Sequence, residues 1–225
     1  NATFFFNQPK NEPVFSYAKG SKERDLLSKE LEKQYNQCIE IPIIINGKEI
    51  RTGNVSEVVM PTEHSHVLAK FHKADKETVQ KAIEAALEAR KKWENVHWID
   101  RCSIMLRAAE LLAGKYRYVI NAATMLGQGK NPFQAEIDSA CETIDFLRFN
   151  VHYASKIYAQ QPLSDNSAIN RLEYRGLEGF VYAISPFNFT SIACNLNISP
   201  VLMGNVTVWK PATTAVLSNY YLMKI

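Results

Sequence analysis

An asparagine and a lysine each follow a strand-like segment near the end of the sequence. Asn188 comes shortly after an apolar run that ends at Ile184, and Lys210 closes the run of residues 206–210. An asparagine amide can donate hydrogen bonds to an anionic oxygen. A lysine ammonium can donate to the hydroxyl or phosphate groups of a nucleotide. The two side chains therefore suit a site in which an oxyanion is stabilised beside a nucleotide.

Each of these residues also has a simpler interpretation. An asparagine at a strand-to-helix turn often caps the helix, and spacing alone favours that role for Asn188. A lysine at a strand end most often lies in water, so Lys210 by itself does not indicate a cofactor. The sequence contains neither G-x-G-x-x-G nor G-x-x-x-x-G-K-[ST], so the common dinucleotide and phosphate loops are absent from it.

The elements around the two residues alternate between strand and helix. We expect strand, helix, strand and helix at residues 178–184, 192–203, 206–210 and from 215 onward. This order predicts a parallel sheet with a right-handed crossover. Ligands of such sheets bind beyond the carboxyl ends of the strands. Residues 185–190 and 210–214 would occupy those positions.

Upstream, the sequence predicts a hairpin and further strands. The β-branched run that ends at Ile45 is followed by Asn46 and Gly47, a strong signal for a type I′ turn, and the chain should return over residues 48–51. Two more strands are expected, at residues 66–71 and 171–175.

The remaining upstream sequence predicts helices at residues 22–37, 75–95, 99–113, 115–126 and 132–158. Asp75 is a typical N-cap, Gly114 a typical terminator, and Pro132 suits the first helical position. On the second helix the apolar residues recur at helical spacing and predict a face turned to a core: Val79, Ile83, Ala86, Leu87 and Trp93.

Composition narrows the class of protein. The 225 residues carry 26 basic and 23 acidic side chains, a net charge of +3 without a basic tract, so nucleic acid is not an expected partner. Apolar runs are too short for a membrane-spanning helix. The cysteines are far apart and form no metal-ligand motif, and we expect each to be buried and unreactive: Cys38, Cys102, Cys141 and Cys194.

Residues 184–189 and 200–211 together resemble the aldehyde dehydrogenase superfamily, and most closely its pyrroline-5-carboxylate dehydrogenases. Further similar segments lie at residues 11–14, 82–87, 127–130, 134–138 and 174–180. Thr190 supports the narrower resemblance, because many aldehyde dehydrogenases have proline there. The resemblance covers essentially the whole chain. It implies an α/β class, namely the N-terminal part of the aldehyde dehydrogenase fold, with helices, the start of a parallel Rossmann-like sheet and an oligomerisation hairpin.

The resemblance also implies roles for individual residues. Asn188 matches the asparagine that forms half of the oxyanion hole, and Lys210, followed by Pro211, matches the lysine that binds the adenosine ribose of NAD. Phe189 would form an aromatic wall of the aldehyde pocket. Glu142 would contact the polar end of the substrate, although a solvated helix glutamate is an equal alternative. The loop beside the nicotinamide would contain Ile184, Ser185, Pro186 and Phe187.

The implied organisation has four parts: an N-terminal arm at 1–40, a helical part of the cofactor-binding domain with its leading hairpin at 41–155, the oligomerisation hairpin at 156–178, and the start of the NAD-binding unit at 179–225. The implied reaction is the NAD-dependent oxidation of glutamate semialdehyde to glutamate in proline breakdown. A homo-oligomer in the mitochondrial matrix is expected, with no metal and no membrane.

Two features depart from the full pattern. Thr213 stands where many NAD-preferring members have an acidic residue, which weakens the expected preference for NAD over NADP. The family's catalytic cysteine and glutamate are expected beyond Ile225, so we expect the 225 residues alone to be inactive. The alternatives are a non-catalytic product that associates with full-length aldehyde dehydrogenase subunits, or a partial gene model.

Overall fold

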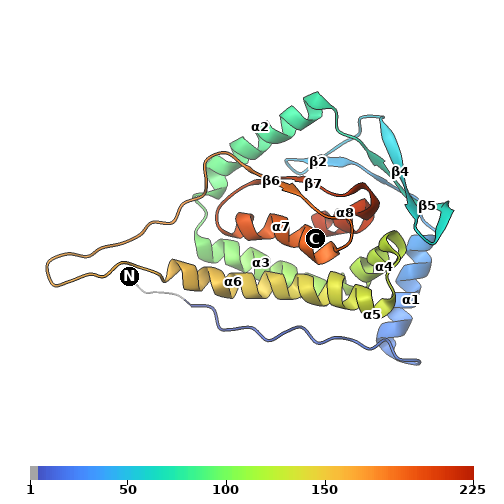
Figure 1. Cartoon of the computed structure of the whole chain (residues 1–225), viewed down its shortest axis with the longest axis horizontal. Helices are drawn as coiled ribbons and strands as arrows, with labels where there is room; N and C mark the ends of the chain where they lie inside the picture. The colour runs from blue at the N-terminus through green and yellow to red at the C-terminus, as the bar shows by residue number, and fades with distance from the viewer. Residues whose placement is uncertain (1–4) are drawn as a thin grey trace.

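The computed structural model describes residues 5–225, and helices form its middle layer (Figure 1). Helix α6 (Thr143–Tyr158) packs against α3 (Trp98–Ala113) and against α7 (Thr190–Leu202). The N-terminal arm, residues 5–21, runs along the outer side of α6 (Figure 1). The predicted helix at 99–113 is therefore confirmed and lies in this central layer.

A three-stranded sheet covers one end of the helices. Its central strand β5 (Glu63–His72) pairs in parallel with β1 (Ile39–Ile41) and antiparallel with β4 (Val55–Met60). The predicted strand at 66–71 is confirmed and is longer than expected.

The predicted hairpin is also confirmed, as a separate two-stranded ribbon. Strands β2 (Ile43–Ile45) and β3 (Lys48–Ile50) are antiparallel. Asn46 and Gly47 have φ values of 51° and 71°, and positive φ at both central positions defines the type I′ turn that the sequence indicated.

Helix α2 (Lys76–Trp93) begins where predicted, because the side chain of Asp75 accepts a hydrogen bond from the Thr78 amide at 2.8 Å. The predicted core-facing stripe is partly wrong. Val79 and Leu87 are exposed, since α2 lies at the edge of the molecule and packs mainly on β2 and β7 (Thr207–Lys210) (Figure 1).

Helices α1 (Lys22–Tyr35) and α4 (Arg117–Gln128) pack against each other and confirm two further predictions. The break expected at residues 127–129 is shorter than predicted. Gly127 is a buried helical residue, and the helix ends only at Gly129, which takes the left-handed conformation with φ 67°.

The long helix predicted from Pro132 is interrupted by a π-helical segment. Asn131 and Gln134 form a capping box around α5 (Pro132–Ala135). The seven residues of η1 (Glu136–Glu142) then widen the helix before α6 begins. Such π segments are uncommon and often occur at functional sites. The apolar spacing of the sequence gave no sign of it.

The strand–helix–strand–helix unit is confirmed. Strand β6 (Val181–Ile184) pairs in parallel with β7, and α7 crosses between them; η2 (Thr213–Ala215) and α8 (Val216–Lys224) follow β7. Ile184 lies opposite Lys210, so the two strands end side by side.

The strand predicted at 171–175 is wrong. Residues 160–178 instead form a long loop that projects from the molecule (Figure 1) and is held by a few bonds, such as that from the Leu172 amide to the Gln161 side chain at 2.8 Å. The loop returns at Gly176, where a Cβ atom would meet the Gly204 carbonyl oxygen at 2.6 Å. Only glycine fits this close approach.

Within residues 5–225, three apolar cores hold these elements together, and the smallest of them, Tyr17, Leu27 and Ala122, joins the arm and α1 to α4. The largest core lies between the central helices, and the second core joins the three-stranded sheet to α4 and α8. The main members of the largest core are Met105, Leu112, Ile120, Ile144, Leu147, Val151 and Leu202.

A buried ionic cluster joins the arm to η1. Glu136 and Arg117 are 0% and 1% exposed and form a salt bridge. Glu136 also accepts hydrogen bonds from the Phe15 amide at 2.9 Å, the Tyr17 hydroxyl at 2.6 Å and the Asn121 amide at 2.7 Å. The arm is therefore fixed to the helices through one carboxylate.

The donors around Glu136 decide its charge. Burial alone would raise the pKa of the Glu136 carboxyl, but hydrogen bonds from Arg117 and Tyr17 outweigh burial and hold that pKa below its ordinary value of 4.5. For the Tyr17 hydroxyl, burial and the neighbouring Glu136 both raise the pKa. Glu136 is thus a carboxylate, and Tyr17 is its donor.

Replacing Glu136 with glutamine should lower the free energy of unfolding of the chain by about 3 kcal/mol, because the buried Arg117 charge then keeps only Glu12 as an ionic partner. Urea or thermal unfolding measures this change. Glu110→Gln is the matched control, since Glu110 pairs with Arg107 on the surface and should contribute less than about 1 kcal/mol.

The same pair predicts a pH dependence. A carboxyl whose pKa is lowered by folding stabilises the fold above its unfolded pKa, and this contribution is lost as the pH falls through the folded value. The stabilisation by Glu136 should therefore be complete above its ordinary pKa of 4.5 and decrease below it. Equal acid sensitivity of the parent and the Glu136→Gln variant would contradict this assignment.

Candidate functional site

The carboxyl ends of β6 and β7 bring the first predicted residues together. The Ser185 amide donates to the Lys210 carbonyl at 3.3 Å and so extends the pairing beyond Ile184. The Trp209 indole donates to the Ser185 hydroxyl at 3.0 Å. Ser185 is buried, so its side chain supports the loop that follows it.

The following loop presents its side chains on the surface. Ile184, Phe187, Asn188 and Phe189 are exposed, and Pro186 is half-buried. Lys210 is exposed and Pro211 is half-buried beside this loop. The structure therefore gathers these predicted oxyanion, cofactor and pocket residues at one edge of the parallel pair.

Asp138, which the sequence did not indicate as a site residue, binds the first turn of α7. Its carboxylate accepts from the Thr190 amide at 3.0 Å, the Ser191 amide at 3.0 Å and the Ser191 hydroxyl at 2.8 Å. Free amides at a helix N-terminus favour a negative charge at this position. The Asn188 side chain makes no capping bond to α7, so the simpler interpretation of Asn188 as a cap is not supported within residues 5–225.

Lys130, also missed, lies between Asp138 and the loop. Its ammonium donates to the Asp138 carboxylate and to the Asn188 carbonyl, each at 2.6 Å. The same ammonium lies 4.5 Å from the centre of the Phe189 ring, within the range of a cation–π contact. The residues that connect to the loop thus come from the end of α4 and from η1.

Glu142 is close to this region but is not a freely solvated helix glutamate. It is half-buried, and its carboxylate accepts from the Ser191 hydroxyl at 2.8 Å. The Ser191 hydroxyl has a single proton, so Asp138 and Glu142 compete for it as acceptors. The spacing of acidic residues along residues 136–142 was the only sign of this arrangement in the sequence.

Thr190 forms a buried hydroxyl cluster behind the loop. Its hydroxyl oxygen lies 2.9 Å from that of Thr124, 2.7 Å from the Gln128 amide nitrogen and 3.1 Å from the Ser218 hydroxyl. These partners come from α4 and α8, so Thr190 joins the start of α7 to both helices.

No cysteine of the described part lies in this site. Cys102 and Cys141 are buried as predicted, and burial raises the pKa of the Cys102 thiol to about 11 and that of Cys141 to about 12. A raised pKa keeps a thiol protonated and a poor nucleophile. Cys194 is only half-buried and Cys38 is exposed, so the prediction of burial is wrong for Cys38, which precedes the edge strand β1.

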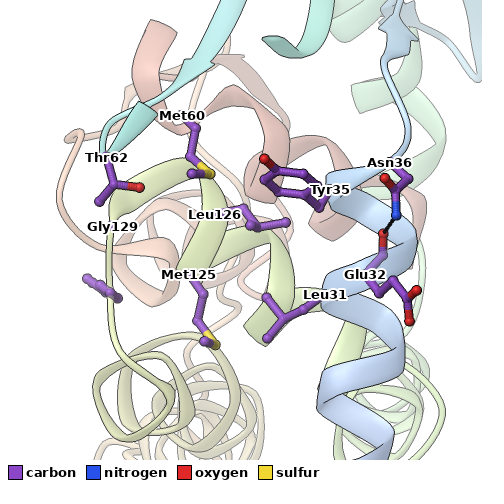
Figure 2. A pocket seen from close by; sticks show the side chains of 10 residues that line it. Leu31, Glu32, Tyr35, Asn36, Met60, Thr62, Met125, Leu126 and Gly129 are labelled. Atoms are coloured by element: carbon purple, nitrogen blue, oxygen red, sulfur yellow. Dashed lines mark hydrogen bonds between the residues drawn. The ribbon is translucent and has the colours of Figure 1, made fainter. Parts of the chain in front are cut away.

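A cavity of about 460 Å³ lies elsewhere, between α1, the end of α4 and the β4–β5 turn (Figure 2). Leu31, Met60, Met125 and Leu126 make its wall largely apolar (Figure 2). Lys130 alone belongs both to this lining and to the candidate site. The cavity therefore meets the candidate site only through Lys130, which bonds the Asn188 carbonyl.

Within residues 5–225, no group of three or more histidine, cysteine, aspartate or glutamate side chains is placed to hold a metal ion. None of the helices in this part of the chain combines the length and apolar character needed to cross a membrane.

A parallel strand pair whose carboxyl ends carry an exposed asparagine and lysine is typical of α/β proteins, whose ligands bind beyond the carboxyl ends of the strands. Residues 49–225 match the model of the aldehyde dehydrogenase family, and the chain belongs to that family.

The relatives share one name. The chain is 53% identical over its whole length to delta-1-pyrroline-5-carboxylate dehydrogenase of Agaricus bisporus, and 50% identical over 96% of its length to the mitochondrial protein of that name from Homo sapiens. It spans 41% and 38% of the lengths of these two relatives. The resemblance stated from the sequence is confirmed.

Solved structures agree with this placement. The crystal structure of the delta-pyrroline-5-carboxylate dehydrogenase from Mycobacterium tuberculosis has a TM-score of 0.97 and 46% identity to this chain, and the match covers 100% of the chain and 42% of that structure. The same TM-score and identity apply to the structure of that protein bound with NAD. The expected fold class is therefore confirmed.

Replacing Thr190 with valine should lower the free energy of unfolding by about 1–3 kcal/mol, because the buried Thr124, Gln128 and Ser218 groups lose a shared partner while the shape is kept. Thr214→Val is the control, since Thr214 is exposed. Thermal unfolding measures both variants, and equal losses in the two would contradict the structural role of the cluster.

Proposed function

We propose that this chain is the N-terminal part of an NAD-dependent dehydrogenase that oxidises glutamate semialdehyde, the open form of pyrroline-5-carboxylate, to glutamate. The identity of about half of its residues to relatives of that name carries the proposal. The exposed Asn188 amide at the end of β6, beside Lys210 at the end of β7, supports it from the structure.

The residues at the strand ends fit NAD. Lys210 is exposed and makes no ion pair within residues 5–225, so its ammonium is available to the hydroxyl groups of a ribose. Ile184 and Phe187 present apolar surface next to it, which suits the face of a nicotinamide ring. NAD, when bound, would accept the hydride from the substrate.

Asn188 would act on the substrate oxygen. When a family cysteine that lies outside these 225 residues attacks the aldehyde carbonyl, negative charge develops on that oxygen, and the Asn188 amide would donate a hydrogen bond to it. Phe189 would pack against the aliphatic part of the substrate. Glu142 is proposed to face its polar end, with the Ser191 hydroxyl setting the direction of the carboxylate.

Asn188→Ala, in the protein expressed from its complete coding sequence, should lower kcat about a hundredfold or more with glutamate semialdehyde and NAD, the usual effect of losing one oxyanion donor. The Kd for NAD should stay within about twofold, because the amide acts on the substrate. Asn7→Ala is the control, since Asn7 is exposed on the arm. An unchanged kcat in Asn188→Ala would contradict the proposal.

We also propose that residues 160–178 dock on a second subunit. Leu163 and Ile169 are 93% and 84% exposed, and the hydrogen bonds of the backbone around them join residues of the same loop, such as that from the Asn170 amide to the Ser164 hydroxyl. Extended segments of this kind are completed by pairing with another sheet edge. The same surface would allow the chain alone to associate with full-length subunits, which is the alternative function.

The double substitution Leu163→Ser and Ile169→Ser should therefore shift the protein toward monomers, which light scattering after size exclusion would detect. Val14→Ser and Val79→Ser is the control pair, since both residues are exposed apolar residues on other surfaces. An unchanged mass would exclude these two side chains as contributors to the subunit contact.

The names of the relatives also suggest where in the cell this protein acts. The proteins from Dictyostelium discoideum and Homo sapiens are named as mitochondrial, so we propose that this protein acts in mitochondria, in the matrix.

A further inference from the structure

One lysine connects the Asn188 loop to the helix that follows it. The Lys130 ammonium lies 2.6 Å from the Asn188 carbonyl oxygen and 2.6 Å from the Asp138 carboxylate. The Lys130 and Asp138 side chains are 16% and 4% exposed, so the pair is shielded from water. Charge-assisted bonds that are shielded in this way are stronger than neutral ones at the surface.

Asp138 controls the other end of the same loop. It binds the Thr190 and Ser191 amides, which form the first turn of α7. Lys130 therefore fixes the carbonyl of Asn188. Asp138, which binds Lys130, fixes the first amides of α7. Because the peptide group is planar, fixing the Asn188 carbonyl also fixes the plane that contains the Asn188 Cα atom, from which the side chain extends.

The Asn188 side chain itself has no hydrogen-bond partner within residues 5–225, and it is exposed. Its own contacts thus do not hold the amide in one direction. Donors to an oxyanion are effective when they are fixed before the charge develops. The backbone bond from Lys130 is the contact that supplies this restriction.

A lysine suits the position for a geometric reason. Its ammonium has three N–H donors that can point in different directions. Here they serve a carboxylate and a carbonyl, while the positive charge lies over the Phe189 ring at 4.5 Å. Lys130 thus contacts two of the three residues that the proposed function places against the substrate, Asn188 and Phe189.

We propose that Lys130, anchored by Asp138, is a positioning residue that sets the direction of the Asn188 amide toward the substrate oxygen. This inference rests on the proposed function of Asn188. Lys130 acts through the Asn188 backbone and is not itself a donor to the substrate.

The test is a double-mutant cycle in the protein expressed from its complete coding sequence. Lys130→Met removes the ammonium and keeps much of the apolar stem, and it should lower kcat about tenfold with the Kd for NAD unchanged, as expected when a donor is displaced by a small distance. Lys29→Met, on the exposed face of α1, is the control and should leave kcat unchanged.

The decisive variant combines Lys130→Met with Asn188→Ala. If Lys130 acts through the Asn188 amide, the second substitution adds almost no further loss once that amide is gone. Losses that multiply would overturn the inference, and so would an unchanged kcat in Lys130→Met. These outcomes are separate from a failure of the proposed function, which would appear as an unchanged kcat in Asn188→Ala alone.

Two further variants distinguish the positioning role of Lys130 from a loss of stability. Lys130→Gln keeps one donor for the Asn188 carbonyl and should retain more activity than Lys130→Met. Asp138→Asn should reproduce the loss in kcat, because it weakens the anchor of the ammonium. The melting temperature of each variant is measured together with kcat. If the loss of kcat tracks the loss of melting temperature, and is the same whether or not Asn188 is present, the inference is overturned.

Discussion

The structure depends on keeping one buried carboxylate charged. Glu136 has no exposed surface, and an isolated charge there would destabilise the fold strongly. Arg117, Tyr17 and the Phe15 amide compensate it, and through them the arm and α4 are fixed to the same point. This set of contacts fixes the start of η1 to the arm and to α4.

The π-helical geometry extends that constraint to the candidate site. Asp138 and Glu142 belong to the same seven-residue segment as Glu136 and face the start of α7 through Ser191. One widened stretch of helix thus carries a carboxylate for the arm and two for the region of Asn188. Strain or displacement at Glu136 would be transmitted to the site over a few residues, without passing through the apolar cores.

Much of this fold could be predicted from local signals. Asn46 with Gly47, Asp75, and Asn131 with Pro132 each act on their own neighbours, so the hairpin and the helix starts lie where the sequence placed them. The bond from Thr190 to Asp138 joins residues 52 positions apart, and no local pattern encodes it. The exposed side of α2 and the loop at 160–178 were misjudged for the same reason, because burial depends on what packs alongside.

The amide bond from Thr190 to Asp138 also bears on how this sequence can diverge. Proline, the residue that many aldehyde dehydrogenases have at this position, has no N–H and cannot make that bond. A change to proline would remove the hydroxyl that joins α4 to α8 at the same time. The residue at position 190 should then change together with those at positions 124, 128, 138 and 218. The residue at 190 would therefore distinguish one subfamily from another, because each choice there requires different neighbouring residues.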